Sequence, residues 1–420
     1  MIDWKKYRIG DIAEFNTWSI NKDFDYNIIE YIDTSSVEKG RLLDIQILRL
    51  KEAPSRAKRR IKINDILIST VRPNLQHYYF VKDCKDNTIV STGFVVITPT
   101  NKVDPYFLYC LLTTPSYTKY LTQIANSHTS TYPSFNPDII EDSIRLIPEK
   151  DEQIKISKIL LNLDQKIDLL HRQNETLEAI AQVLFKSWFV DFEFPDENGL
   201  PYKSSGGKMM PSELWELPEG WKLVEFGDLL EKIVDNRGRT PPIEQDGILM
   251  MEGNQIALEH SFPVYQPKNK QKYVSELTYN NWFRDGHPKH LDILCATVGT
   301  LPKWCFAPKK TKICIAQNIV GLRSKENIVT PYFLKNLMNT YYFINSFNGR
   351  LLTTAQPSIK VGHLETINVV LPNYEIITKY SDIVKPMYKL IENKCDQIYN
   401  LSIIHDNLLP KLVSGQIRVT

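Results

Sequence analysis

Residues 156–188 read ISKILLNLDQKIDLLHRQNETLEAIAQVLFKSW, and this stretch decides the architecture of the chain. Its apolar residues recur in alternating steps of four and three, which is the spacing of a coiled-coil seam. The seam consists of Ile156, Leu160, Leu163, Ile167, Leu170, Leu177, Ala181, Leu184 and Trp188. Asn174 fills the one missing position, and neither Gly nor Pro interrupts the run. The pattern predicts one long helix that packs against another helix.

A second long helix is expected near the end of the chain, with a less regular seam. This seam runs through Ile383, Met387, Leu390 or Ile391, Ile398, Leu401, His405, Leu408 and Leu412. It slips near Cys395, and Pro386 is expected either to kink the helix or to begin it. We expect the two helices to pack against each other in antiparallel orientation.

The chain contains an internal repeat, which sets its domain organisation. In order along the chain, residues 4–11 match 221–228, 65–71 match 292–298, 105–108 match 331–334, 133–134 match 357–358, and 146–148 match 370–372. Each half starts with short segments rich in Ile, Val, Thr and Phe, which are typical of strands, and ends in one of the long helices. Short helices opened by a proline are expected at residues 105–112 and 331–338.

The repeat predicts an α+β fold with two pseudo-symmetric globular domains separated by two long, antiparallel helices. We expect the first globular domain at residues 1–148, its helix at 149–192, a linker at 193–217, the second globular domain at 218–372 and the second helix at 373–420. The linker is assigned from its Pro, Gly and Ser content.

Composition narrows the class of protein. The 420 residues carry a formal net charge of +2, so a nucleic-acid partner would have to be bound by local patches. Six cysteines in a chain of this length exclude a disulfide scaffold. A cytoplasmic protein is expected, because no apolar stretch is long enough to span a membrane and the first residues lack the core of a signal peptide.

Sequence motifs of catalysis are missing. The sequence has no GxxxxGK[ST] phosphate loop and no [DN]PP[FY] motif of amino-methyltransferases. Its E-x-K string, residues 392–394, falls in a predicted helix rather than in the strand framework of a nuclease. His287, His290, Cys295 and Cys305 lack the paired spacing of a zinc site. We therefore expect no catalytic residue, no metal and no cofactor bound by this chain.

Basic residues gather at corresponding places in the two halves. The first half has Arg56, Lys58, Arg59, Arg60, Lys62 and Arg72, with Asn74 and His77 close behind. The second half has Arg237, Arg239, Lys268, Lys270, Lys303, Lys309 and Lys310. Such clusters contact phosphates, and Arg can also bind guanine through two hydrogen bonds. One charge run alone is most often a solvated surface, but its recurrence in both halves favours DNA binding.

The length of the first helix gives the scale of the expected site. Residues 156–188 would span about 48 Å at ~1.5 Å per residue, which corresponds to about 14 base pairs at ~3.4 Å each. Two domains held apart by antiparallel helices of this length would meet two half-sites somewhat more than one turn apart. The geometry thus predicts a bipartite DNA site.

Four motifs make the chain resemble the specificity subunits of type I restriction–modification systems over nearly its whole length. They are LPEGW at residues 217–221, NETLEAIA followed by LFKSWFVDF within 174–192, RGRTP at 237–241, and LLPKLVSGQI at 408–417. The N-terminus departs from the family pattern, because Trp4 is not preceded by LPEG.

The resemblance implies a non-catalytic subunit whose two target recognition domains each bind one half of a split DNA site. It implies that the helices set the spacer and dock two modification subunits, which carry S-adenosylmethionine and methylate the DNA. Restriction subunits that use ATP and Mg²⁺ can join such complexes. The exposed faces of residues 152–190 and 375–412 are expected to bind the modification subunits. The residues given for these partner-binding helices are Leu160, Leu163, Ile167, Leu170, Leu177, Leu184, Trp188, Leu401, Leu408 and Leu412.

Carried over by position, the resemblance also suggests which loops face DNA. They are residues 65–74 and 127–135 in the first domain and residues 292–303 and 349–359 in the second. Phosphate contacts are expected for Arg56, Lys58, Arg59 and Arg60, whereas Arg72, Asn74, His77, Arg237, Arg239 and Lys303 are expected nearer to bases.

Two rival hypotheses remain at the level of the sequence. The first is a self-contained methyltransferase or nuclease, which the missing motifs disfavour. The second is a helical scaffold whose globular domains bind proteins. The scaffold hypothesis predicts that reversing the charges within residues 56–60 leaves DNA affinity unchanged.

Overall fold

The computed structural model describes residues 4–21, 23–128, 132–213, 215–258, 260–264, 266, 268–309, 312–352 and 356–419. The chain forms two compact units, of which unit 1 comprises Met1–Lys166 with Ile404–Thr420 and unit 2 comprises Ile167–Ile403. The boundaries between the units therefore cut across both long helices. Within the described ranges, no helix is both long and apolar enough to cross a membrane.

Unit 1 contains two four-stranded sheets, with strand orders β2-β11-β8-β9 and β6-β3-β10-β7. These strands are β2 (Ala13–Phe15), β3 (Ile28–Ile32), β6 (Gln46–Arg49), β7 (Ala57–Arg60), β8 (Ile66–Ser69), β9 (Tyr78–Phe80), β10 (Thr88–Ser91) and β11 (Phe94–Pro99). Two strand pairs join β1 (Lys5–Arg8) to β12 (Ile144–Ile147) and β4 (Val37–Glu38) to β5 (Arg41–Leu42). The short helices are α1 (Pro105–Leu112), α2 (Pro115–His128) and α3 (Asp138–Glu141).

Unit 2 repeats this plan, with sheets ordered β16-β22-β19-β20 and β18-β17-β21. Its strands are β13 (Met209–Met210), β14 (Leu217–Pro218), β15 (Lys222–Glu225), β16 (Leu230–Val234), β17 (Ile248–Met251), β18 (Lys272–Val274), β19 (Ile293–Ala296), β20 (Trp304–Phe306), β21 (Ile313–Ile315), β22 (Ile319–Ser324) and β23 (Asn368–Leu371). Its short helices are α5 (Glu276–Trp282), α6 (Pro331–Met338), α7 (Tyr341–Asn348) and α8 (Val361–Glu365). The parallel pair β3–β10 recurs as β17–β21, and the antiparallel pair β1–β12 recurs as β15–β23. The predicted repeat and the α+β fold class are confirmed.

The central strands and the proline-opened helices follow from their local sequences. All residues of β8 and of β19 are buried, as continuous apolar runs covered on both faces should be. Helix α1 is capped by Asp104, whose carboxylate accepts a hydrogen bond from the Phe107 amide at 2.9 Å. Thr330 caps α6 in the same way. Both helices have the predicted bounds, because the cap and the proline at the first turn fix where each begins.

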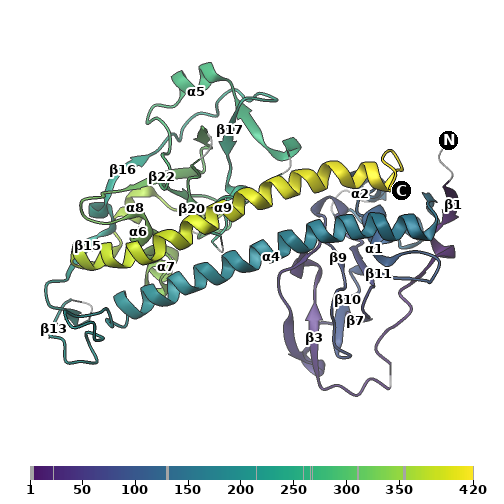
Figure 1. Ribbon diagram of the computed structural model, residues 1–420, viewed down its shortest axis with the longest axis horizontal. Helices are drawn as coiled ribbons and strands as arrows, with labels where there is room; N and C mark the ends of the chain where they lie inside the picture. The colour runs from purple at the N-terminus through teal and green to yellow at the C-terminus, as the bar shows by residue number, and fades with distance from the viewer. Residues whose placement is uncertain are drawn as a thin grey trace. The chain divides into compact units, whose positions relative to one another are not determined.

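The two long helices, α4 (Lys150–Phe189, teal in Figure 1) and α9 (Tyr374–Val413, yellow), are each 40 residues long. In unit 2, the Tyr380 hydroxyl donates to the Ala181 carbonyl at 3.1 Å, and the Asn174 amide donates to Cys395 Sγ at 3.5 Å. The later residue of α4, Ala181, contacts the earlier residue of α9, Tyr380, and the earlier Asn174 contacts the later Cys395. The two helices therefore pack in antiparallel orientation, as predicted.

The seam of α4 is confirmed, whereas the seam of α9 needs correction. None of the predicted α4 seam residues is exposed, and Asn174 is itself buried. On α9, however, Ile383 is 44% exposed and Leu390 is 50% exposed. The buried positions on this part of α9 are Ile377, Tyr380, Val384, Tyr388 and Ile391. Of the alternatives Leu390 and Ile391, the buried residue is Ile391, and Ile398 and Leu412 are buried as predicted. The helix begins at Tyr374, so Pro386 does not begin it.

Each unit is completed by the segment that follows the long helix of the other half. In unit 1, Gly415 lies against the ring of Trp4, and both Trp4 and Arg418 donate hydrogen bonds to Glu152. In unit 2, the corresponding Trp221 stacks on Phe194 with ring centroids 5.1 Å apart. The tail of α9 thus belongs to unit 1, and the tail of α4 belongs to unit 2.

Candidate nucleic-acid interface

In unit 1, the end of strand β8 pairs with a loop that is distant in sequence. The Arg72 amide donates to the Pro133 carbonyl at 2.8 Å, and the Phe135 amide donates to the Thr70 carbonyl at 3.1 Å. The Thr70 amide in turn donates to the Gly93 carbonyl at 2.9 Å. These contacts join residues 70–72, 92–93 and 132–135 into one surface, the loop edge of unit 1.

Unit 2 builds the same edge with the same backbone contacts. The Gly299 amide donates to the Pro357 carbonyl at 3.0 Å, and the Ile359 amide donates to the Thr297 carbonyl at 2.9 Å. The Thr297 amide donates to the Asn318 carbonyl at 2.8 Å. The loop edge of unit 2 therefore consists of residues 297–299, 317–318 and 356–359. In each unit the structure brings together the two loops that the sequence predicted to face one ligand.

Only part of each segment that was predicted to face DNA is accessible at the surface. Residues 65–69 and 292–297 are buried, because they belong to the central strands or precede them. Asp65 accepts hydrogen bonds from the Thr98 hydroxyl at 2.6 Å and from the Lys62 amide at 2.9 Å, and burial raises the pKa of its carboxyl. Asp292 instead forms an ion pair with Arg323 at 2.7 Å. These two aspartates hold the starts of β8 and β19 and do not face a ligand. Of the loops expected to complete the edges, residues 129–131 and 353–355 lie outside the described residues.

The basic cluster of unit 1 forms a row along strand β7. Arg56 precedes the strand, Lys58 and Arg60 belong to it, and Lys62 follows it. A register shift between Ala57 and Arg59 interrupts the regular alternation of side chains in this strand. The row begins at the loop edge, since the Arg56 carbonyl accepts a hydrogen bond from the Thr92 amide at 2.9 Å. Arg56, Lys58 and Lys62 are exposed. Together they give unit 1 a positive strip that is suited to a phosphate backbone.

Aromatic rings flank the far end of this row. The Arg60 guanidinium lies 5.9 Å from the ring centroid of Trp18 and 5.7 Å from that of Phe24. The Lys62 ammonium lies 5.5 Å from the Trp18 ring, which is 50% exposed. Cation–π contacts of this kind restrain long basic side chains without neutralising their charge. Sequence reasoning missed Trp18, because it lies about 40 positions before its partners and carries no local signal.

Arg59 does not belong to the row, and its prediction as a phosphate contact is wrong. It is half-buried on the opposite face of β7, where its guanidinium donates to the Asn16 side-chain carbonyl and to the Phe94 backbone carbonyl. Burial lowers its pKa. The register of β7 shifts between Ala57 and Arg59, so the sequence alone does not show which face of the strand Arg59 takes.

The predicted base-reading residues of unit 1 divide into two groups. Arg72 and Asn74 are exposed on a tip at the loop edge, where residues Pro73–Leu75 form one 3₁₀ turn. The Arg72 guanidinium lies 5.5 Å from the ring centroid of Tyr132, which sequence reasoning also missed. His77 is half-buried behind the tip, and its Nδ1 contacts the Val37 carbonyl. The prediction that His77 approaches bases is therefore corrected.

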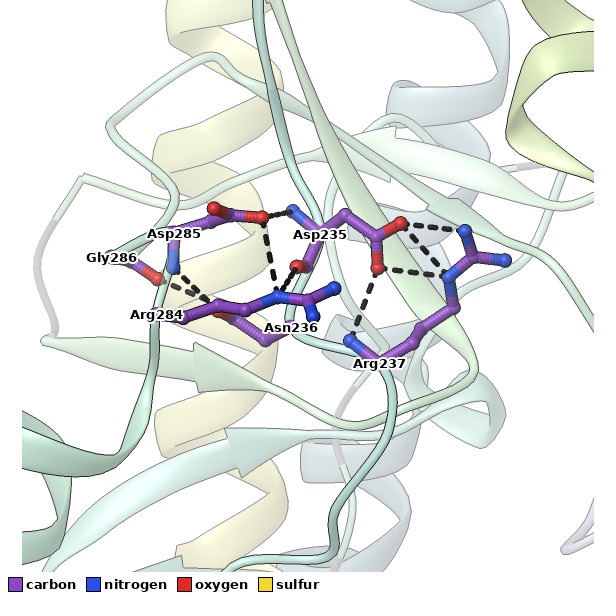
Figure 2. A network of polar contacts seen from close by, with 6 residues as sticks. All are labelled: Asp235, Asn236, Arg237, Arg284, Asp285 and Gly286. Carbon is purple, nitrogen blue, oxygen red and sulfur yellow. Dashed lines mark hydrogen bonds and ion pairs between the residues drawn. The ribbon is translucent and has the colours of Figure 1, made fainter.

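In unit 2, the Asp235–Arg239 loop is held by the polar network of Figure 2. The Arg237 guanidinium binds both carboxylate oxygens of Asp235, with Nε at 2.8 and 3.0 Å. These hydrogen bonds hold the pKa of the Asp235 carboxyl below its ordinary value. Asn236 donates to the Gly286 carbonyl at 2.9 Å and accepts from the Asp285 amide at 3.0 Å.

This network changes the roles expected of the two arginines. Arg237 is engaged in shaping its own loop, whereas Arg239 is exposed. The next residue, Thr240, accepts a hydrogen bond from Gln317 at 2.6 Å, which ties the loop to the loop edge of unit 2. Arg239 is thus the better placed of the two for a ligand.

The predicted lysines of unit 2 lie in several places. Lys268 forms an exposed ion pair with Asp246 at 3.3 Å, and Lys270 is exposed nearby. Lys303 is half-buried. The backbone amide of Lys309 donates to Glu392 of α9 at 2.9 Å. Lys310 lies outside the described residues.

The residues predicted to bind partners along the helices are engaged within the chain. Leu160, Leu170, Trp188 and Leu412 are buried. The other six, Leu163, Ile167, Leu177, Leu184, Leu401 and Leu408, are half-buried. These side chains form the intramolecular seam, and the binding of partners to the exposed faces of residues 152–190 and 375–412 stays a prediction. Other apolar side chains on the same helices remain exposed, such as Val183 at 69% and Leu390 at 50%.

The residues considered for a metal site have other surroundings. Cys295 and Cys305 are fully buried, and burial raises the pKa of the Cys295 thiol to about 12. His287 stacks on Tyr279 with ring centroids 3.6 Å apart, and His290 contacts Glu392. Among the residues that the structure describes, no group of three or more His, Cys, Asp or Glu side chains could hold a metal ion.

The chain is similar in sequence to known proteins of type I restriction enzymes. Residues 1–179 match the model of a family described as the type I restriction modification DNA specificity domain. The type I restriction enzyme HindI specificity subunit of Haemophilus influenzae is 43% identical over 197 residues, which cover 46% of this chain and 42% of that protein. The type I restriction enzyme MjaIX specificity subunit of Methanocaldococcus jannaschii is 26% identical over 348 residues, which cover 81% of this chain and 75% of the relative.

A solved structure of an S subunit of a type I restriction-modification system from M. genitalium is 13% identical, with a TM-score of 0.49 over 98% of this chain and 96% of that one. In sequence, the chain is therefore similar to specificity subunits of type I restriction enzymes, and the match with the HindI subunit spans less than half of that protein. The resemblance of the chain to type I specificity subunits, inferred from its motifs, is confirmed.

Proposed function

We propose that this chain is the DNA-sequence specificity subunit of a type I restriction–modification complex, and that each unit reads one half of a bipartite site. The observation that carries the proposal is the repeated loop edge. Two units with little identity in these loops hold them by the same backbone contacts, and each edge adjoins exposed cations. Because the two loop edges share their backbone contacts but differ in their side chains, they suit two half-sites of different sequence.

DNA binding by the subunit would divide between positioning and base reading. Arg56, Lys58 and Lys62 form a strip that suits phosphates, which fix the register of the protein on the duplex. Arg72 and Asn74 in unit 1 and Arg239 in unit 2 are exposed beside their loop edges, where base edges could be reached. Sequence would be read at the edges and affinity supplied along the strip.

The catalytic steps would belong to partner subunits. The modification subunits would supply S-adenosylmethionine and the methyl transfer, and restriction subunits would supply ATP- and Mg²⁺-dependent cleavage. This chain would present DNA to them and hold them on the outer faces of α4 and α9. The exposed apolar side chains there, including Ile180 at 46% and Val183 at 69%, support such a docking role.

The first test maps base methylation in the host genome by long-read sequencing, with the gene present and deleted. We expect methylation to disappear at one split motif of two short half-sites with a fixed gap. Unchanged methylation at every motif would contradict the proposal.

The second test measures binding of a split-site duplex by the complex that carries Arg56→Glu and Lys58→Glu. We expect weaker binding to all sequences and a salt dependence whose log–log slope falls by about 0.9 for each lost phosphate contact. Lys6→Glu on strand β1 is the matched control, since Lys6 is exposed but lies outside the row and the loop edge. Unaltered affinity of the double variant would favour the scaffold hypothesis instead.

A further inference from the structure

The tip of unit 1 is a rigid turn that presents polar and apolar side chains to solvent. The Leu75 amide donates to the Arg72 carbonyl and the Gln76 amide donates to the Pro73 carbonyl, both at 2.9 Å. Pro73 is buried beneath the turn, whereas Arg72, Asn74 and Leu75 are exposed. The backbone of the tip is therefore fixed before any ligand binds, which lowers the entropy lost on binding.

Arg72 occupies a backbone conformation that costs energy for an arginine. Its φ and ψ are 48° and 64°, in the left-handed region that residues other than glycine seldom adopt. The equivalent position of unit 2 is Gly299, with φ 110°. Both loop edges thus require a positive φ at the same point, where the strand end turns away from its partner loop.

The contrast between the two units indicates that the Arg72 side chain is used. Glycine meets the backbone requirement without strain, as it does in unit 2. An arginine at this position adds strain and gives unit 1 an exposed guanidinium that unit 2 lacks there. Strained backbone of this kind is concentrated at functional sites, where the rest of the structure holds it in place.

Tyr132 restrains this guanidinium. Its ring is 68% exposed and lies 5.5 Å from the guanidinium carbon, in the range of a cation–π contact. Tyr132 belongs to the loop that the Arg72 amide binds through Pro133, so backbone and side chain of Arg72 meet the same loop. A planar guanidinium group that is restrained in this way loses less conformational entropy when it forms two parallel hydrogen bonds.

We infer that Arg72 is the guanine-specific reader of the half-site bound by unit 1, and that Tyr132 is its positioning residue; the inference rests on the proposed function. The guanidinium fork matches O6 and N7 of guanine in the major groove, and no other base offers two acceptors there. The half-site of unit 2 is read without an equivalent of Arg72, because Gly299 has no side chain.

The test compares the DNA motifs selected by complexes that carry wild-type chain, Arg72→Ala or Arg72→Lys, from a randomised duplex library and in the methylated genome. Both substitutions should lower the preference for guanine at one position of one half-site by about ten- to hundredfold. Arg72→Lys keeps the charge but loses the fork, so it separates base reading from simple attraction to phosphate. Tyr132→Phe should keep the preference, and Tyr132→Ala should weaken it at the same position.

Controls lie in both units. Recognition of the other half-site by the same molecules shows that the variants are folded. Thr300→Ala, at the exposed tip of unit 2, should leave the guanine position unchanged, and Arg56→Ala should weaken binding to all sequences alike. An unchanged guanine preference in Arg72→Ala, or an equal loss for every base, would overturn the inference. If the wild-type chain selects a split motif that has no G·C pair, the inference about Arg72 is overturned while the proposed function stands. If the wild-type chain selects no split motif, the proposed function is overturned as well.

Discussion

Arg56 and Arg59 lie three positions apart, yet their guanidinium groups have different surroundings. Arg56 is exposed at the loop edge, whereas Arg59 donates to a side-chain carbonyl and a backbone carbonyl inside unit 1. We expect Arg59→Ala to lower the free energy of unfolding by about 1–3 kcal/mol, because it removes two hydrogen bonds of a half-buried guanidinium, although Asn16 Oδ1 keeps the hydrogen bond from the Val96 amide at 2.9 Å. Urea titration followed by circular dichroism measures this change.

Arg56→Ala is the matched variant for that measurement. It should leave the urea midpoint unchanged and weaken DNA binding, so the two variants separate a structural arginine from a ligand-binding one. Equal urea midpoints for both variants would contradict the assignment of Arg59 to the interior of unit 1.

At the scale of residues, the sequence predicts where basic side chains cluster better than it predicts what each of them contacts. The clusters at 56–62 and 237–239 are found from composition alone. The register shift in β7, which decides the face that Arg59 takes, could not be predicted. The partners of these side chains could not be predicted. The contacts of Tyr132 with Arg72 and of Trp18 with Lys62 each bridge tens of residues and depend on tertiary packing.

In unit 1, the contact between α4 and α9 contains a titratable side chain, His405. His405 lies 3.5 Å from Asp164 of α4 and 3.5 Å from Asp406 of its own helix, and Asp164 also accepts a hydrogen bond from Tyr106 of α1. Burial alone would lower the pKa of His405. The hydrogen bond to Asp406 and the charges of Asp164 and Asp406 outweigh burial, so the pKa is raised above 6.5.

This raised pKa gives unit 1 a defined pH dependence. Since the folded state binds the proton more tightly than the unfolded chain, the added stability is complete below pH 6.5 and is lost as the pH rises through the folded pKa. Urea midpoints measured between pH 5.5 and 9 should therefore fall with rising pH in this window. His405→Gln should flatten the profile, and an unchanged slope in this variant would exclude the His405 contribution.

At the scale of elements, the sequence predicts what is local. The bounds of α1 and α6 follow from a cap and a proline within one turn, and the seam of α4 follows from its heptads. His405 belongs to the predicted α9 seam and does contact Asp164 of α4. The seam was misjudged at Ile383, because Tyr380 and Tyr388 bury their rings against Phe185 and Phe306 and so set the buried face of this part of α9. Such aromatic contacts depend on tertiary packing and are not shown by local periodicity.

For the whole molecule, the division into units predicts where a truncation acts. Removing residues 404–420 takes Leu409, Leu412 and Val413 out of the core cluster that contains Ile156 and Leu160. At ~1.5–3 kcal/mol for each buried side chain, the loss approaches the total stability of a typical domain. We expect unit 1 to unfold at least locally although its own globular sequence is intact.

Hydrogen exchange distinguishes the two units in this experiment. Amides of β8 and β11 should lose protection, and those of β19 and β22 in unit 2 should keep it. Arg418→Ala is the milder control, since it removes only the ion pair with Glu152 and leaves the three apolar residues in place. Equal protection of β8 and β11 in the truncated and full-length chains would contradict the division of the chain into these units.

The positive φ shared by Arg72 and Gly299 also narrows the amino acids that selection can place at the reading tip. Most side chains are strained there, so under the proposed function the position would favour glycine, as at Gly299, or a residue whose contact with DNA would compensate for the strain, as proposed for Arg72. Glycine and arginine codons differ by a single nucleotide. A point mutation at either tip can therefore create or erase a guanine reader in one step, and the host genome would acquire a new pattern of protected sites without any change in the scaffold.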